Sequence, residues 1–157
     1  MDHNPKDYRP NVGMMIINSQ KKIFVGKRLD HPSDFWQMPQ GGIDGKENPE
    51  VAALREMEEE VGIKKNKVKL LSQLQDWHYY SIPEELALTL WKGKFKGQRQ
   101  KWFLFEFHGS DKDINIHTKH PEFSDYQWVG KDFLVPNIVP FKREIYSKLL
   151  EEFKDYL

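Results

Sequence analysis

Apolar residues fall into short runs, separated by polar segments that contain Gly and Pro. The runs at 11–18 and 23–25, joined through the polar residues 18–21, predict a β-hairpin. Two stretches have helical periodicity: residues 48–61, and residues 141–156 with a single apolar stripe. Further strands are expected at 36–38, 68–74, 98–108 and 126–129. Because strands and helices are interspersed, the predicted fold class is α/β (α+β) with a mixed sheet.

The remaining segments have weaker patterns. Residues 28–48 contain two Pro and three Gly and are expected to be mostly loop around a short strand. Residues 76–97 are aromatic, with Pro83 among them, and receive no assignment. Since there is no internal repeat, low-complexity tract or linker, residues 1–157 are expected to form one domain.

Residues 48–61 carry the start and stop signals of a helix. Asn48 can cap the first turn, Pro49 suits the first helical position, and Gly62 is a typical helix stop. At 100° per residue, one arc of this helix is apolar and is expected to face the core. That arc contains Leu54, Met57 and Val61, with Val51 at its flank.

Three carboxylates share another arc, roughly opposite the apolar one. Glu56, Glu59 and Glu60 lie there, together with the small Ala52, and their repulsion costs roughly 0.2–0.5 kcal/mol per neighbouring pair. A solvated helix face is the ordinary interpretation. Here the face has one sign of charge only, and a Gly-rich loop at 39–47 precedes it. These features favour Mg²⁺ or Mn²⁺, which take oxygen ligands and bridge to phosphates.

Composition excludes several classes of protein. The chain has no cysteine, so disulfide scaffolds, thiolate nucleophiles and Cys-ligated metals are excluded. Lys plus Arg and Asp plus Glu are 24 each, which argues against a protein that coats nucleic acid, duplex DNA included. No apolar run approaches the about 20 residues of a membrane helix. We therefore expect a cytoplasmic protein without a membrane partner.

One spacing pattern is specific. After Gly41, five residues lead to Glu47, and seven more lead to the sequence REMEEEVGI at 55–63. This segment resembles the Nudix box, G-x5-E-x7-R-E-U-x-E-E-x-G-U with U apolar, at every fixed position. A match at so many positions is far more specific than a Gly-rich loop alone.

The resemblance extends beyond the box to five other segments. They are YRPNVG at 8–13, WQMPQGG at 36–42, QKWFL at 100–104, PEF at 121–123 and FKR at 141–143. All resemble the Nudix branch that holds bacterial RNA 5′-pyrophosphohydrolases and diadenosine polyphosphate hydrolases. The resemblance implies an α/β/α sandwich around a mixed β-sheet.

The resemblance also implies roles for particular residues. The metal ligands would be Glu56, Glu59, Glu60, Glu122 and the Gly41 carbonyl. Glu47, Arg55 and Gly62 would be structural, the first two bracing the loop against the helix. The implied chemistry is metal-assisted hydrolysis of a nucleoside diphosphate linked to another group.

The residues agree with that chemistry, because an all-acidic face can bind a polyphosphate only through cations. Roughly two or three Mg²⁺ or Mn²⁺ ions would orient the phosphates and lower the pKa of a bound water. A carboxylate would take the proton of that water, and the sequence leaves Glu59 and Glu122 open for this role. Glu56 is the third member of the expected catalytic set.

Substrate contacts are expected outside the box. Arg9 and Arg28 match phosphate-contacting positions, while Phe141 and Lys142 match a pair that stacks on and hydrogen-bonds a nucleobase. On pattern alone, the better interpretation of Phe141 is the first core residue of its helix. Tyr80 matches a tyrosine of the same branch, but the residues before it, His78 and Tyr79, depart from the basic residue common there.

The sequence leaves several functions open. The favoured one is a pyrophosphohydrolase of the 5′-triphosphate or diphosphate end of RNA, supported by the segments at 141–142 and 100–102. A second enzyme activity, asymmetric hydrolysis of diadenosine polyphosphates to yield ATP, fits the same motifs. Two functions without catalysis are also open. One is a Nudix-fold nucleotide-binding module, which would be expected to lose box glutamates, and the other is an acidic protein-interaction helix.

Overall fold

The computed structural model describes residues 3–29 and 34–157. Their strands form one eight-stranded sheet with the central order β3-β2-β1-β7-β5, while β4 pairs with β1, β6 with β7 and β8 with β2. The strands are β1 Tyr8–Ile17, β2 Ile23–Arg28, β3 Trp36–Gln37, β4 Gln40–Gly42, β5 Val68–Gln73, β6 His78–Ser81, β7 Gly97–Phe107 and β8 Phe123–Val129. The helices are α1 Pro49–Val61, α2 Glu84–Trp91, α3 Leu134–Asn137 and α4 Arg143–Glu152.

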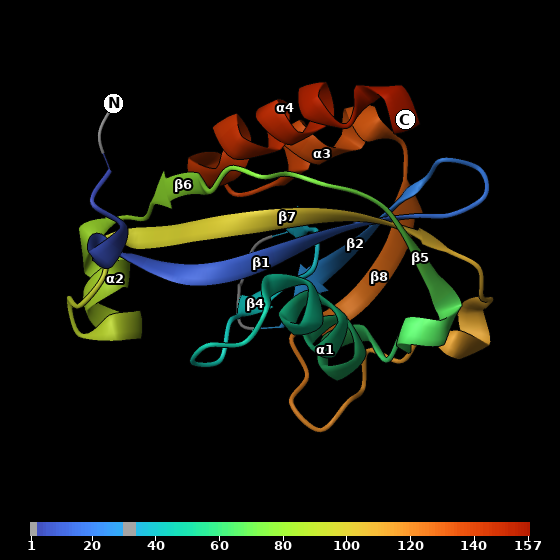
Figure 1. Ribbon diagram of the computed structural model, residues 1–157, viewed down its shortest axis with the longest axis horizontal. Coiled ribbons are helices and arrows are strands. Elements are labelled where there is room, and N and C mark those ends of the chain that lie inside the picture. The colour runs from blue at the N-terminus through green and yellow to red at the C-terminus, as the bar shows by residue number, and fades with distance from the viewer. Residues whose placement is uncertain (1–2, 30–33) are drawn as a thin grey trace.

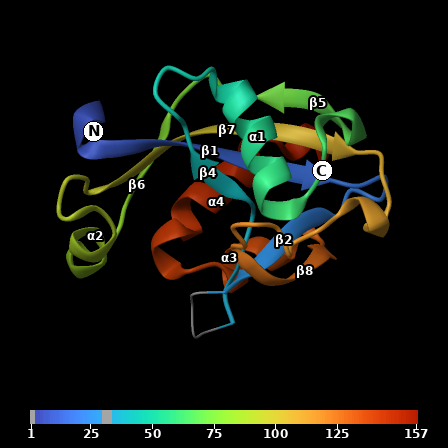
Figure 2. The same cartoon turned by 90° about the horizontal axis from the view of Figure 1, so that it is seen from below.

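The sheet is mixed, as predicted. The long strands β1 and β7 run parallel, whereas the other paired strands are antiparallel. Helix α1 lies on one side of the sheet, and α3 and α4 lie on the other (Figure 1). Figure 2 shows α2 at the end of the sheet near the N-terminus, apart from α1. The three layers confirm the predicted sandwich.

Side-chain alternation along β1 produces two cores. Met14 and Ile16 pack in the cluster beneath α1, while Met15 and Ile17 pack in the cluster beneath α4. Because both faces of β1 are covered, its end is apolar at every position rather than at every second one. The predicted hairpin is confirmed, with Ile17 paired to Ile23.

Several predicted boundaries were wrong. The expected loop at 28–48 contains a second short strand, β4, and its residues 30–33 lie outside the described residues. The unassigned segment 76–97 forms β6 and α2. The last helix begins at Arg143, because residues Pro140–Lys142 form a 3₁₀ turn before it. In the described part of the chain, no helix is long and apolar enough to span a membrane.

Candidate active site

Strand β4 brings the Gly-rich segment against α1. Its residues Gln40–Gly42 pair with β1 and leave Gly41 facing the helix. A Cβ on Gly41 would overlap the Glu56 carboxylate, so the absence of a side chain permits this approach. The helix itself begins and ends as predicted: Asn48 accepts a hydrogen bond from the Glu50 amide, and Gly62 adopts a left-handed φ of 73°.

Arg55 binds the loop to the helix. Its Nε and Nη2 both donate to the Glu47 carboxylate at 2.9 Å, and Nη2 also donates to the Gly42 carbonyl at 3.0 Å. This pairing lowers the pKa of Glu47 and raises that of Arg55. A two-point guanidinium–carboxylate pair fixes both groups in one plane, so the loop is anchored where the carboxylates of α1 begin.

The same guanidinium also holds two of the acidic side chains. Its Nη1 donates to Glu56 at 2.9 Å and to Glu59 at 3.1 Å. Glu59 is half-exposed and points along the helix toward Arg55. In the described residues, no three His, Asp or Glu side chains are arranged to hold a metal ion.

Glu60 is the buried member of the set, with 7% of its surface exposed. Burial is the main reason that its pKa is raised well above the ordinary value, followed by the negative charges of Glu56 and Glu122. Arg28 and a backbone hydrogen bond from Gln40 act in the opposite direction. One carboxylate oxygen, Oε2, has no hydrogen-bond partner among the described residues. Such a buried, unpaired carboxylate oxygen is suited to a cation.

Glu122 reaches the site from the loop before β8. Its backbone carbonyl accepts a hydrogen bond from the Leu29 amide at 2.9 Å, which ties this loop to the end of β2. Its carboxylate is close enough to raise the pKa of Glu60. The structure therefore brings together Glu56, Glu60 and Glu122, with Glu59 on the outer side of the helix.

The predicted orientation of α1 was partly wrong. Val51 is 55% exposed instead of flanking the core, and Glu60 is buried instead of lying opposite it. The helix is turned so that Ala52 packs inward in the core cluster, while Glu56 contacts the backbone of Gly41 in β4. Met57 and Val61 are buried as predicted, and Leu54 is partly buried against the same cluster.

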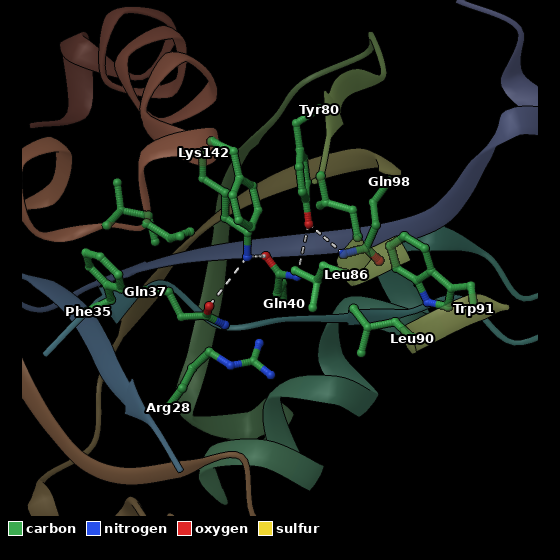
Figure 3. A pocket seen from close by; sticks show the side chains of 14 residues that line it. Arg28, Phe35, Gln37, Gln40, Tyr80, Leu86, Leu90, Trp91, Gln98 and Lys142 are labelled. Atoms are coloured by element: carbon green, nitrogen blue, oxygen red, sulfur yellow. Dashed lines mark hydrogen bonds between the residues drawn. The ribbon is translucent and has the colours of Figure 1, made fainter. Parts of the chain in front are cut away.

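A cavity of about 200 Å³ lies next to strand β4, whose residue Gln40 lines it. Four predicted substrate-contacting residues line it: Arg28, Tyr80, Phe141 and Lys142. Figure 3 shows Arg28 pointing into it from β2, below Lys142 and Gln40. Arg28 therefore links the cavity to the acidic cluster, because it lines the cavity and its charge lowers the pKa of Glu60.

The aromatic wall of the cavity is formed by Tyr80 and Phe141, whose rings stack with centroids 6.3 Å apart. The Lys142 ammonium lies 5.4 Å from the centre of the Tyr80 ring and donates to Gln40 Oε1 at 3.0 Å and to Gln37 Oε1 at 3.4 Å. The Tyr80 hydroxyl accepts from Gln98 and Gln40, and burial raises its pKa. The wall therefore combines a stacking surface with fixed polar groups.

Arg9 lies outside the lining of the cavity but next to it. Its Nη1 donates to Gln98 Oε1 at 3.0 Å, and its Nη2 is close to Gly42. Gln98 lines the cavity, and Gly42 accepts from Arg55. Arg9 consequently bridges the cavity and the Gly-rich strand. The two residues that depart from the family pattern are engaged elsewhere: His78 bonds Glu152 at 2.8 Å, and Tyr79 stacks on His3.

Sequence reasoning missed several lining residues. Gln98 falls within a predicted strand, at the same parity as the buried Trp102 and Leu104, which was a signal that its amide faces the interior. Gln37 lies within the short predicted strand at 36–38, and Gln40 follows it by two residues. The apolar side of the cavity comes from Leu86, Leu90 and Trp91 of α2, in the segment that had no assignment.

The comparisons with known proteins agree with this geometry. The profile of the NUDIX domain matches residues 7–149. The chain belongs to the Nudix family. A Nudix relative from Roseobacter denitrificans, named RNA pyrophosphohydrolase, is 49% identical over 150 residues, which is 96% of this chain and 94% of that one. One of the same name from Rhodospirillum rubrum is 54% identical over 145 residues, covering 92% and 86%.

Solved structures of other Nudix-like proteins share the fold. The E. coli dihydroneopterin triphosphate pyrophosphohydrolase matches with a TM-score of 0.69 at 20% identity, covering 94% of this chain and 99% of that one. A C. elegans Ap4A hydrolase binary complex matches with a TM-score of 0.66 at 17% identity, covering 92% and 98%. At these identities the likeness concerns the fold alone.

Proposed function

We propose that this Nudix protein is a metal-dependent RNA pyrophosphohydrolase. It hydrolyses the 5′-triphosphate or diphosphate end of RNA, releases pyrophosphate or phosphate, and leaves a 5′-monophosphate. The observation that carries the proposal is the position of Arg28, which lines an aromatic cavity and also acts on the buried carboxylate of Glu60. The names of the curated relatives support the same substrate.

The carboxylates fit a divalent cation. Glu60 has a buried oxygen without a partner among the described residues, and Glu56 and Glu122 add negative charge beside it. We propose that these three, Glu59 and the Gly41 carbonyl hold roughly two or three Mg²⁺ or Mn²⁺ ions when substrate is bound. Such ions neutralise phosphate charge and lower the pKa of a bound water.

The residues of the chain then have separate tasks. Arg9 and Arg28 bind phosphate oxygens, and Phe141 stacks on a base whose edge meets the Lys142 ammonium. Water attacks phosphorus while the anhydride bond to the leaving phosphate breaks. Its proton passes to Glu59 or Glu122, which are less buried than Glu60 and can meet a water. Arg55 keeps Glu56 and Glu59 within reach of the loop.

The second candidate is asymmetric hydrolysis of diadenosine polyphosphates to give ATP. The cavity is compatible with this substrate, because the stacked Tyr80 and Phe141 rings would accept the adenine of a diadenosine polyphosphate as readily as a base of RNA. A Nudix-fold binding module without catalysis has less support, since every box glutamate is present. We place the enzyme in the cytoplasm, together with its RNA substrate.

The test compares specificity constants. The purified protein is given Mg²⁺ and either a 5′-triphosphorylated RNA trinucleotide or diadenosine tetraphosphate. We expect the larger kcat/KM for the RNA, with pyrophosphate or phosphate as the released product. A larger value for diadenosine tetraphosphate would establish the second candidate. Hydrolysis of neither substrate would contradict the enzymatic proposal as a whole.

A further inference from the structure

Positive charge is concentrated in one segment of this neutral chain. Residues 92–101 contain five Lys or Arg and no Asp or Glu, although the whole chain has 24 of each sign. The five are Lys92, Lys94, Lys96, Arg99 and Lys101. The segment begins in the loop 92–96 after α2 and continues into the first half of β7.

Two of these cations lie on a face of the sheet together with a tryptophan. The Arg99 guanidinium is 4.2 Å, and the Lys101 ammonium 5.2 Å, from the centre of the Trp77 ring. We call these three residues the cation–aromatic strip. Residues Phe103 and Phe105, further along the same face, are buried in the cluster beneath α1, whereas Trp77, Arg99 and Lys101 are partly exposed.

The described part of the chain offers the strip no carboxylate partner. Within residues 3–29 and 34–157, no carboxylate forms an ion pair with Arg99 or Lys101. The Arg99 Nε is buried and has no hydrogen-bond partner in the same described ranges, and the Lys101 ammonium donates to the Gln75 carbonyl. A tryptophan that carries two such cations presents both a stacking surface and charge for an anion.

The strip and the cavity share strand β7 but lie on opposite faces of the sheet. Gln98 lines the cavity, and Arg99, the next residue of β7, points to the opposite face of the sheet. Trp91 also lines the cavity, and its ring packs edge-on against Phe95 of the basic loop at 5.9 Å between centroids. Lys94 lies 5.3 Å from the centre of the Phe95 ring. The basic loop is therefore next to the cavity wall, and it leads along the chain into the strand that carries Arg99 and Lys101.

We propose that the strip and the basic loop 92–96 form a second binding surface for single-stranded RNA, which holds nucleotides downstream of those in the cavity. Bases stack on Trp77 or on the Arg99 guanidinium plane, while Lys101 and the loop lysines meet phosphates. Single-stranded RNA matches a surface that offers both cations and aromatic faces, because its phosphates are anionic and its unpaired bases stack. The proposal rests on the proposed function, because it assigns a path to the body of the same substrate.

The test measures binding, without any need for turnover. Fluorescence anisotropy is recorded for a labelled, unstructured RNA dodecamer and for a trinucleotide, both with a 5′-monophosphate. The wild type is compared with the R99Q/K101Q double variant and with W77L. The matched control is K64Q/K65Q, which removes two exposed lysines near the end of α1.

We expect R99Q/K101Q and W77L each to weaken dodecamer binding by at least about fivefold. The plot of log affinity against log salt should flatten by about 0.7 for each cation removed. Trinucleotide binding should change less than twofold with every variant, and the control should behave as the wild type does. Equal effects on both RNAs, or no effect on the dodecamer, would overturn the proposal. The second result is the one expected if the surface binds another macromolecule, such as a protein, instead of RNA.

Failure of the strip and failure of the proposed function can be told apart. A strip that does not bind RNA leaves hydrolysis of the triphosphorylated trinucleotide intact in the wild type. Conversely, an enzyme that does not hydrolyse RNA ends leaves the anisotropy measurement unaffected, because the labelled RNA carries only a monophosphate.

Discussion

The Glu56 carboxylate lies directly against the backbone of Gly41, with no room between them for a methyl group. Glu56 belongs to α1 and Gly41 to β4, so this contact sets the distance between the acidic helix and the Gly-rich strand. It also places a main-chain carbonyl beside the carboxylates that we assign to metal binding.

Substitution of Gly41 by Ala should therefore displace Glu56. We expect turnover to fall about 100-fold, since a small misplacement of a reacting group has effects of this size, and stability to fall by about 1–3 kcal/mol. Initial rates and urea unfolding measure the two effects. Gly130→Ala is the control, because a Cβ there meets nothing closer than the tip of Lys22 at 3.8 Å. Full activity in Gly41→Ala would contradict this account of the contact.

Arg55→Lys keeps the charge but removes the planar fork that binds Glu47 and Glu56. We expect kcat/KM to fall about 10- to 100-fold, as is usual when a group that orients metal ligands is lost. Steady-state kinetics measure the loss, and Arg143→Lys, at an exposed site at the start of α4, serves as the matched control. Equal kinetics in the two variants would show that a simple positive charge suffices at residue 55.

Glu60 should reduce the stability of the metal-free protein at neutral pH. The pKa of Glu60 is raised in the folded state, so folding favours the protonated carboxyl group. The contribution of Glu60 to stability is therefore present at low pH, and it is lost as the pH rises through the folded-state pKa. We expect Glu60→Gln to be more stable than wild type at pH 7 with a metal chelator, and the difference to vanish below the ordinary glutamate pKa. Urea unfolding across pH measures this.

Divalent metal should reverse that order. Added Mg²⁺ should raise the free energy of unfolding of the wild type more than that of Glu60→Gln, because ligands stabilise the state that binds them. Glu59→Gln, at a half-exposed position, is the control and should change little without metal. A wild type that is already the more stable protein at pH 7 in the chelator would contradict the burial argument.

Phe141→Ala should weaken recognition of the base. Loss of one stacking contact is worth about 1–3 kcal/mol, so kcat/KM for a triphosphorylated trinucleotide should fall about 5- to 150-fold. The loss should appear mainly as a higher KM, since Phe141 lies on the cavity wall rather than among the carboxylates. Leu88→Ala, exposed on α2 and outside the cavity lining, is the control. If both variants had equal KM values, Phe141 would be only a packing residue.

Local signals were enough to predict the limits of α1 but not its rotation. Asn48 and Gly62 act through contacts within a few residues, so both ends were found. Which side of the helix is buried depends on how α1 packs against the rest of the fold, which buries Ala52 and Glu60 and leaves Val51 exposed. The packing of α1 involves residues from other elements, so the periodicity of the helix alone does not predict it.

In the candidate site, too, local sequence signals predict some residues and not others. The box glutamates could be predicted as site residues because their spacing is specific. Gln37 and Gln40 were not predicted, because glutamine in a Gly- and Pro-rich segment resembles an ordinary loop residue. Helix α2 was missed because its exposed leucines do not form a clear buried stripe, and part of its apolar surface faces a cavity instead of a core.

The most direct test of the central claim is turnover of a 5′-triphosphorylated RNA with Mg²⁺ by wild type, Glu59→Gln and Glu60→Gln, with folding checked by circular dichroism. The account predicts a 5′-monophosphate product from the wild type, and rates lower by more than about 100-fold in both folded variants. Turnover within a few-fold of wild type in both variants would contradict the assignment of this acidic face to metal-assisted catalysis.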